Sequence, residues 1–278
     1  MTSAANKSAI TFRDIDSVDE LKAVVEMQRT AWGVEDLEIV PVTQLAAVRH
    51  VGGTLVGAFD DRRLVGFAYG FYGHLNRRLV HHSHMLAVDP NYRNRDLGFK
   101  LKVEQLKRVR DDRLADRITW TFDPLQSLNA HFNFNKLGVL ADTYKVNFYG
   151  SDATSFLHRT GTDRLLVTWL IESPRVIGML NRRSPEGAGR TSAPKEPAAG
   201  TASTKGDSSE GNFIAIEIPT NIGDIEREDL DLARLWREKT RRSFTEALEK
   251  GFIVTDYVLG SGRTGMYILR RKTIGQFE

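Results

Sequence analysis

The sequence contains no cysteine in 278 residues and no long apolar run. The first absence excludes disulfides, thiolate nucleophiles and cysteine metal sites, and it fits a reducing compartment. No apolar stretch approaches the ~20 residues of a membrane span, and the start of the chain lacks the apolar core of a signal peptide. The histidine spacing contains no ligand pattern such as H-E-x-x-H, so no metal is expected. We therefore expect a soluble, cytoplasmic protein with no membrane partner.

An excess of one charge sign is also missing, since 39 Lys and Arg stand against 36 Asp and Glu. Nucleic-acid-binding proteins concentrate basic charge far more strongly, so no nucleic-acid partner is expected. The sharpest basic cluster runs from Arg93 to Arg110. It fits either a solvated helix face or a site for a small phosphorylated ligand.

Hydrophobic residues make up 41% of the chain, enough for a packed core. One stretch, residues 184–212, consists almost entirely of small, polar and charged residues. Such a composition cannot bury enough apolar surface to offset its ordering entropy, so we predict a flexible linker. The chain is thereby divided into a main domain over residues 1–183 and a tail over residues 213–278.

Apolar periodicity and turn residues predict the elements of the main domain. Helices are expected over residues 17–32, 42–49, 97–114 and 128–136, and strands over residues 9–15, 54–59, 64–72, 79–88, 117–122 and 164–171. Three successive strands form an antiparallel meander, and the helix after the third makes its exit strand parallel to it. The predicted fold class is α/β, a mixed, mostly antiparallel sheet with helices on both faces.

The tail is predicted to be a β-α-β-β extension. A strand over residues 213–218 precedes a helix over 229–250 and a hairpin with strands over 252–259 and 264–271. The helix carries an apolar stripe that is too broad for an isolated helix and needs a partner surface. We therefore expect the tail to dock on the main domain or on a partner subunit, the second arrangement giving a homodimer.

The segment after the strand that ends at Val88 carries the clearest chemical signal. A short loop leads to a helix that begins near Leu97, and a helix N-terminus offers unpaired N–H groups and a positive dipole end. Gly98 allows close approach to the backbone, and Arg93 adds a bidentate cation. These residues indicate a pyrophosphate site.

The pattern x-V-D-P-x-Y-R-x-x-x-x-G resembles the acyl-CoA-binding segment of the GNAT (Gcn5-related N-acetyltransferase) superfamily. Arg93 and Gly98 match the family motif, whereas Asp96 stands where glycine is usual. The predicted element order reproduces that of the family over about residues 9–172. The longer strings W-T-F-D-P-L, K-L-G and N-F-Y-G resemble a bacterial subgroup of predicted acyltransferases.

This resemblance implies a GNAT-like domain that uses acetyl-CoA or another acyl-CoA as co-substrate. The backbone of Leu86, Ala87 and Val88 would bind the pantetheine arm. The resemblance also places six residues around the pyrophosphate: Arg93, Arg95, Leu97, Gly98, Phe99 and Lys100. Phe134 occupies the position of the tyrosine that in many members protonates the leaving thiolate. In an enzyme, water, another residue or Tyr144 would then take that role, or the thiolate would leave unassisted.

The reaction of the family is direct attack of an amine on a thioester, which needs a base and an aligned acceptor. His84 is the candidate base. Asp123 is a further catalytic candidate, which holds the acceptor amine or accepts its proton, with capping of the following helix as the alternative. Acceptor-binding candidates are Glu38, Asn129, Tyr149 and Arg164. The subgroup resemblance suggests a small-molecule amine, such as an amino acid, as acceptor. The alternative is a non-catalytic GNAT-fold protein that binds acyl-CoA or another ligand, which Asp96 and Phe134 both favour.

Overall fold

The structure is a computed structural model that describes residues 9–33, 36–150, 159–182, 213–260, 262–273 and 275–276. Its contacts divide the chain into two compact units. Unit 1 comprises residues 1–121 and 147–162, and unit 2 comprises residues 122–146 and 163–278. The predicted linker over 184–212 lies outside the described residues, so its flexibility and the boundaries beside it stay predictions.

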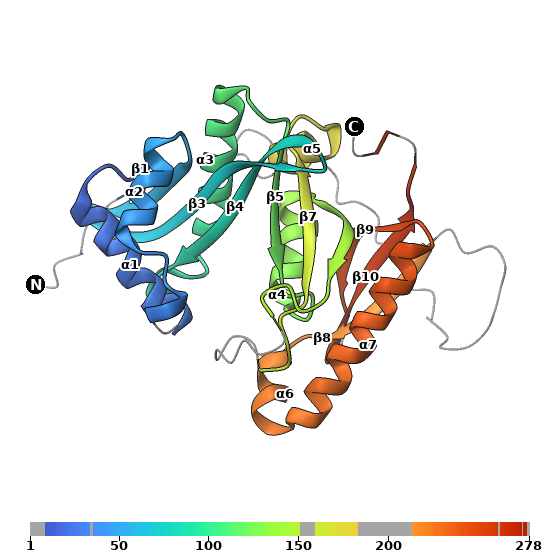
Figure 1. Cartoon of the computed structure of the whole chain (residues 1–278). Coiled ribbons are helices and arrows are strands. Elements are labelled where there is room, and N and C mark those ends of the chain that lie inside the picture. Colours follow the sequence, from blue (N-terminus) through green and yellow to red (C-terminus); the bar gives the residue numbers. More distant parts are fainter. Residues whose placement is uncertain are drawn as a thin grey trace, which may run out of the picture. The chain divides into compact units, whose positions relative to one another are not determined.

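The strands of unit 1 follow the spatial order β1-β2-β3-β4-β5 (Figure 1). They are β1 (Thr11–Asp14), β2 (Thr54–Asp60), β3 (Arg63–Leu75), β4 (Arg78–Val88) and β5 (Arg117–Phe122). β1 to β4 pair antiparallel, and β4 pairs parallel with β5. The parallel pair arises because helix α3 (Leu97–Asp112) crosses over between these two strands. The predicted meander and crossover are both confirmed.

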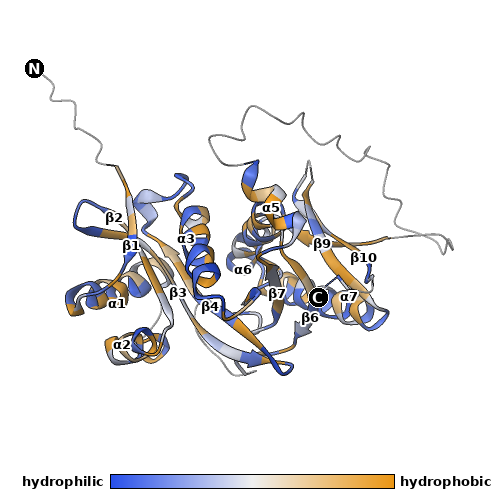
Figure 2. Cartoon of the chain, turned by 90° about the horizontal axis from the view of Figure 1, so that it is seen from above, coloured by the Kyte–Doolittle hydropathy of each residue, from blue (hydrophilic) through white to orange (hydrophobic). Residues whose placement is uncertain are grey.

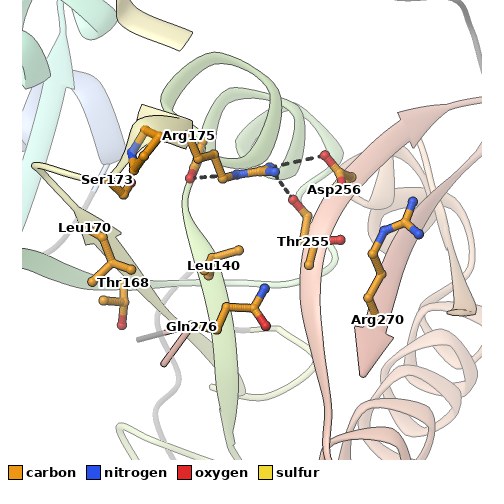
Figure 3. Close-up of a pocket in the computed structure, with 11 residues that line it drawn as sticks. Leu140, Thr168, Leu170, Ser173, Arg175, Thr255, Asp256, Arg270 and Gln276 are labelled. Carbon is orange, nitrogen blue, oxygen red and sulfur yellow. Dashed lines mark hydrogen bonds and ion pairs between the residues drawn. The ribbon is translucent and has the colours of Figure 1, made fainter. Parts of the chain in front are cut away.

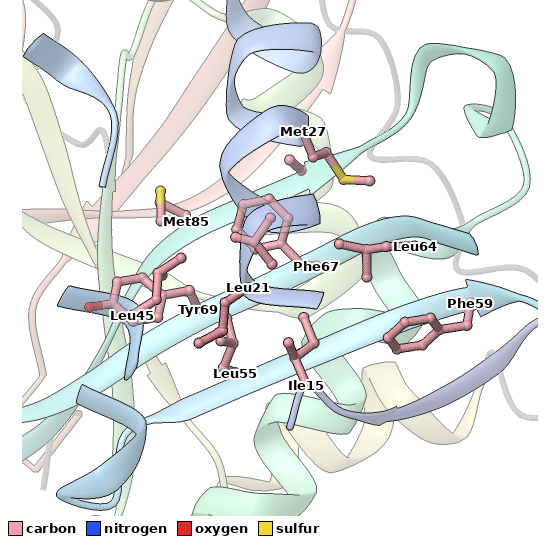
Figure 4. Packing of buried hydrophobic residues seen from close by; sticks show 12 residues of the cluster. Ile15, Leu21, Met27, Leu45, Leu55, Phe59, Leu64, Phe67, Tyr69 and Met85 are labelled. Carbon is pink, nitrogen blue, oxygen red and sulfur yellow. The ribbon is translucent and has the colours of Figure 1, made fainter. Parts of the chain in front are cut away.

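Helices cover both faces of the sheet in unit 1, as predicted. Alternation along the strands sends Leu55 and Phe59 to one face and Val56 and Ala58 to the other. Helices α1 (Val18–Trp32) and α2 (Val42–His50) pack on the first face, and α3 packs on the second. Figure 4 shows part of the first cluster, which includes Ile15, Leu21, Met27, Leu45, Leu55, Phe59, Leu64, Phe67, Tyr69 and Met85. Both α1 and α3 mix polar and apolar residues, as amphipathic helices do (Figure 2).

A capping box opens α1. The Ser17 side chain accepts a hydrogen bond from the Glu20 N–H at 3.2 Å, and the Glu20 carboxylate accepts one from the Ser17 N–H at 3.3 Å. Gly33 ends the helix with φ of 62°, a conformation that glycine adopts without strain. Two short 3₁₀ helices, η1 (Asp36–Glu38) and η2 (Pro90–Tyr92), complete the helical segments around the sheet.

The strands of unit 2 follow the order β7-β6-β9-β10-β8. They are β6 (Leu140–Lys145), β7 (Arg164–Leu170), β8 (Phe213–Pro219), β9 (Phe252–Leu259) and β10 (Thr264–Arg271). The helices are α4 (Ser127–Ala130), the π-helix η3 (His131–Leu137), α5 (Pro174–Asn181), α6 (Ile222–Glu228) and α7 (Leu230–Glu249). The predicted C-terminal extension is therefore confirmed, with α6 as an additional helix. β9 pairs with β6 through Ala141 and Val254, so the tail continues the sheet from a strand of the main domain.

Three predictions of elements need correction. Strand β6 was missed because a bulge between Ala141 and Thr143 interrupts the apolar alternation. Helix α5 was missed although Ser173 caps it and Pro174 opens its first turn. The helix expected over 128–136 divides into α4 and η3, whose wider winding turns the later side chains to a different face.

Candidate functional site

The turn between β4 and α3 is held by hydrogen bonds and an ion pair to two aspartates, Asp89 and Asp60. Asp89 accepts from the Asn91 N–H at 2.9 Å and forms an ion pair with Arg63 at 2.7 Å. The Tyr92 hydroxyl donates to Asp60 at 2.6 Å. These contacts fix the backbone that leads into α3.

The N-terminus of α3 presents backbone donors. Its cap residue Asp96 has φ of 59° and makes no side-chain capping bond. The Lys100 N–H donates to the Asp96 carbonyl at 3.1 Å, which closes the first turn. The N–H groups of Leu97 and Gly98 precede that bond, and N–H groups at the start of a helix have no carbonyl partner one turn earlier. Together with the helix dipole they favour an anion at this end.

Gly98 lies in this first turn, and the packing around it does not require a glycine. A Cβ atom built on it would meet only the Leu86 side chain, at 3.8 Å, which is ordinary van der Waals contact. Its φ does not fall in the left-handed range that favours glycine. The protein itself would accept a larger residue, so the missing side chain leaves the backbone open to a ligand.

Three exposed cations accompany these donors: Arg93, Arg95 and Lys100. The Arg95 guanidinium lies over the Tyr92 ring, 4.7 Å from its centroid. Among the described residues, the side chains of Arg93 and Lys100 form no ion pair. The predicted neighbours Leu97 and Phe99 are buried and reach the site only through their backbone. The predicted cluster is therefore assembled at one helix end.

The edge of β4 beside β5 is open next to this helix. On its other edge β4 pairs with β3, which engages Leu86, Ala87 and Val88. With β5 it pairs only at His81 and His82. Within the described part of unit 1, residues 83–88 have no β5 partner, because the two strands part after this pair. Their backbone groups can accept an extended amide chain as a strand would.

A buried polar network lies where the two strands part, and sequence reasoning missed it. Lys102 of α3 is only 2% exposed. Its Nζ donates to the Ser83 hydroxyl at 2.9 Å and lies 3.5 Å from the centroid of the Trp120 ring. Burial lowers the pKa of Lys102 well below its ordinary value. The sequence grouped Lys102 with exposed cations, yet its spacing from Gln105 and Val109 places it on the apolar side of α3.

His84 occupies a bulge in β4. Tyr69 pairs with Met85 and Gly70 pairs with Ser83, so His84 is the extra residue between them. Its ring lies 6.4 Å from that of His82 between centroids, so the two histidine rings lie on the same side of the strand. Although His84 is exposed, desolvation by the surrounding protein lowers the pKa of its imidazole. The imidazole is therefore neutral at pH 7, the form that a general base requires.

Asp123 and Tyr144 lie in unit 2, in contact with the tail. Both oxygens of Asp123 accept from Arg237 of α7, each at 2.7 Å. The Tyr144 hydroxyl donates to Asp163 at 2.7 Å, and Asp163 also binds Arg241 at 2.9 Å. Burial and the Asp163 carboxylate raise the pKa of Tyr144. These contacts join the tail to the main domain, and the catalytic roles of both residues stay predictions.

The predicted acceptor residues are distributed over both units. In unit 1, Glu38 is exposed in η1, and Tyr149 packs edge-on against Phe148 with 4.9 Å between ring centroids. In unit 2, Asn129 is exposed in α4, and Arg164 is buried at the start of β7. Their acceptor-binding roles also stay predictions.

Phe134, at the position of the family tyrosine, is a core residue. It is fully buried in η3, and its ring lies 6.4 Å from that of Phe122 and 5.8 Å from that of Tyr267, between centroids. Tyr267 in turn donates to the Pro124 carbonyl at 2.7 Å. Phe134 therefore contributes to the packed core of unit 2, and its ring does not face solvent.

The described residues contain no group of three or more His, Asp or Glu side chains that could hold a metal ion. None of the helices they form combines the length and apolar character of a membrane span.

Comparison with known proteins places these features in context. Residues 21–139 match the profile of the acetyltransferase (GNAT) family. No curated protein sequence matches the chain. Among solved structures, ribosomal-protein-S18-alanine N-acetyltransferase from Escherichia coli is 14% identical with a TM-score of 0.47, over 59% of this chain and 96% of that chain. Aminoglycoside 6'-acetyltransferase type Ii is 18% identical with a TM-score of 0.47, over 59% and 98%. The PaiA N-acetyltransferase from Thermoplasma acidophilum, solved with coenzyme A, is 17% identical with a TM-score of 0.40, over 58% and 98%.

Proposed function

We propose that the protein is an acyl-CoA-dependent N-acyltransferase, because residues 21–139 match the profile of the acetyltransferase (GNAT) family. It moves an acyl group from the CoA thioester to the amine of a small acceptor such as an amino acid. A cytoplasmic location and a homodimeric state belong to the same proposal, without nucleic-acid or membrane partners.

The observation that carries the proposal is Gly98 at the start of α3. Since the surrounding protein leaves room for a Cβ atom there, the glycine is explained by a ligand that approaches the backbone. The N–H groups of the first turn suit a pyrophosphate, and so does the Arg93 side chain, which has no ion-pair partner in the part of the chain that the structure describes. The open edge of β4 beside Leu86 and Val88 suits the amides of a pantetheine arm.

The proposed chemistry assigns His84 as the base that removes a proton from the acceptor ammonium group. The free amine attacks the thioester carbonyl carbon, a C–N bond forms, and the C–S bond breaks. The attacking nitrogen loses a second proton when it becomes the amide. The departing thiolate takes up one proton, and the other of the two leaves to solvent. Tyr144 is the proposed donor to the thiolate, since a phenol is protonated at pH 7, and it recovers its proton from the amide nitrogen.

A second candidate function is binding of acyl-CoA without catalysis. It is favoured by Asp96, whose carboxylate stands at the cap of the helix proposed to hold the pyrophosphate. A negative charge at this position weakens the attraction for an anion.

Calorimetric titration of the full chain with acetyl-CoA, succinyl-CoA and free CoA tests both candidates. Binding in the micromolar range, followed by thiol release in a screen of amino acids and other amines, supports the enzyme. Binding without thiol release for any amine supports the second candidate. Absence of binding to all three compounds overturns the CoA site and both candidates with it.

A further inference from the structure

Unit 2 contains a cavity of about 290 Å³ that shares no residue with the segment proposed for acyl-CoA (Figure 3). It lies beside β6, β9, β10 and the start of α5. The cavity is lined by Gly138, Leu140, Thr168, Leu170, Ser173, Pro174, Arg175, Thr255, Asp256, Arg270 and Gln276. Its volume is near the lower end of the ~300–1,000 Å³ found for small-molecule sites. A small metabolite is therefore the size of ligand that it can hold.

Arg175 lines the cavity, and its guanidinium is held by hydrogen bonds to three groups. Its Nε donates to the Gly138 carbonyl at 3.0 Å, and its Nη2 donates to the Thr255 carbonyl and to Asp256, the latter at 3.1 Å. The guanidinium thus satisfies carbonyl groups on both sides of the gap where β6 and β9 diverge. Figure 3 shows these contacts as dashed lines. Since Asp256 neutralises Arg175, this pair contributes no net charge.

Arg270 leaves one positive charge at the cavity. It follows the buried Leu269 on β10, and its own side chain is exposed. Within the described part of the chain no carboxylate pairs with it. The opposite wall is apolar, formed by Leu140, Leu170 and Pro174. The cavity therefore combines an aliphatic surface with one net positive charge, that of Arg270, because Asp256 neutralises Arg175.

We propose that this cavity binds a short, branched aliphatic carboxylate. The carboxylate accepts charge-assisted hydrogen bonds from Arg270, and the alkyl chain packs on Leu140 and Leu170. Asp256 uses one oxygen for Arg175, so its other oxygen can receive an ammonium group. The same chemistry is offered by an α-amino acid and by a simple carboxylic acid, and the experiment separates these two sources.

Ligand-observed NMR on the full chain compares leucine, 4-methylpentanoate and the uncharged 4-methylpentanamide at millimolar concentrations. We expect at least one carboxylate to bind and the amide to bind at least tenfold more weakly. Tighter binding of leucine than of 4-methylpentanoate identifies an amino acid site, and the reverse order identifies a simple acid site. Equal binding of the amide, or binding of none of the three, overturns the proposal.

Substitutions of Arg270 test whether the carboxylate binds in this cavity. Arg270→Gln should weaken carboxylate binding about tenfold or more, because it removes a charge-assisted contact. Arg270→Lys should retain binding within a few-fold. The matched control is Arg271→Gln, the next residue of β10, which points to the other face and does not line the cavity. An Arg270→Gln protein that binds as tightly as the unmodified chain overturns the site, whatever the outcome for acyl-CoA.

Discussion

Arg237 in α7 and Asp123 after β5 form a bidentate ion pair that is almost removed from solvent. The two N–O distances are 2.7 Å, and the side chains are 3% and 13% exposed. Burial alone would lower the pKa of the Arg237 guanidinium. The Asp123 carboxylate and, beyond it, Asp163 raise that pKa overall, so Arg237 stays ionised. A second pair, Arg241 with Asp163, lies one helical turn further along α7. The two arginines thus join α7 to Asp123, which follows β5, and to Asp163, which precedes β7.

Removing one partner of the first pair should destabilise the protein strongly. Arg237→Met leaves the Asp123 carboxylate buried without its cation, which should cost about 3–5 kcal/mol. The double variant Arg237→Met with Asp123→Leu should recover much of this loss, because no buried charge remains. Urea unfolding followed by tryptophan fluorescence measures both effects.

The matched control is Arg234→Met on the exposed side of α7, where Arg234 pairs with the solvated Asp231. Its effect should stay below about 0.5 kcal/mol. A loss for Arg237→Met no larger than that of the control would show that the buried pair does not hold the tail.

The fold was more predictable than the site because its signals are local. The tail hairpin was predicted with both strands at their observed bounds, since alternation and the residues Gly260 and Gly262 between the strands are adjacent in sequence. The helix end at Gly98 was found for the same reason. The partner of Asp123 is 114 residues away, and no local pattern connects the two. Lys102 was misjudged because burial of a charge depends on packing that periodicity alone does not specify.

Gly98→Ala should change stability and acyl-CoA affinity in opposite directions. Alanine has a higher helix propensity by about 0.8–1.0 kcal/mol in a helix interior, and a Cβ atom has room here. The unfolding free energy should therefore rise by up to ~1 kcal/mol. Calorimetry should show acyl-CoA binding weakened several-fold, because the methyl group obstructs approach to the backbone.

Gly178→Ala in α5 is the control for this pair of effects. A Cβ atom there meets nothing within 4 Å, so the same gain in stability is expected. Its acyl-CoA affinity should not change. Equal affinities for Gly98→Ala and the unmodified chain would remove the main support for the proposed pyrophosphate position.

The β4 histidines should make the protein less stable in acid. Burial lowers the pKa of His81 to about 3 and that of His82 to about 4, against about 6.5 in an unfolded chain. Between these values the unfolded state binds more protons than the folded state, so stability falls as the pH drops below ~6.5. The loss per group is at most about 1.4 kcal/mol per pH unit.

His82→Gln tests this pH dependence without removing the polar contact to Thr119, which lies 3.1 Å from the His82 ring nitrogen. The fall in melting temperature between pH 7 and pH 5 should be smaller in this variant than in the unmodified chain. The exposed His74→Gln serves as a control and should leave the fall unchanged. Identical slopes for all three proteins would place the acid sensitivity elsewhere.

Asp96 combines two properties that substitution can separate: its left-handed backbone and its charge. Asp96→Asn keeps a residue that tolerates φ of 59° and removes the negative charge from the helix N-terminus. Asp96→Gly also removes the charge and restores the residue usual in the family motif. If the carboxylate opposes the pyrophosphate, both variants should bind acyl-CoA several-fold more tightly, and the difference should shrink at high salt. If only Asp96→Gly binds more tightly, the side-chain bulk is the obstacle. Weaker binding in both variants would mean that the carboxylate supports the loop that carries Arg93, and that this chain has adapted its phosphate site around an aspartate.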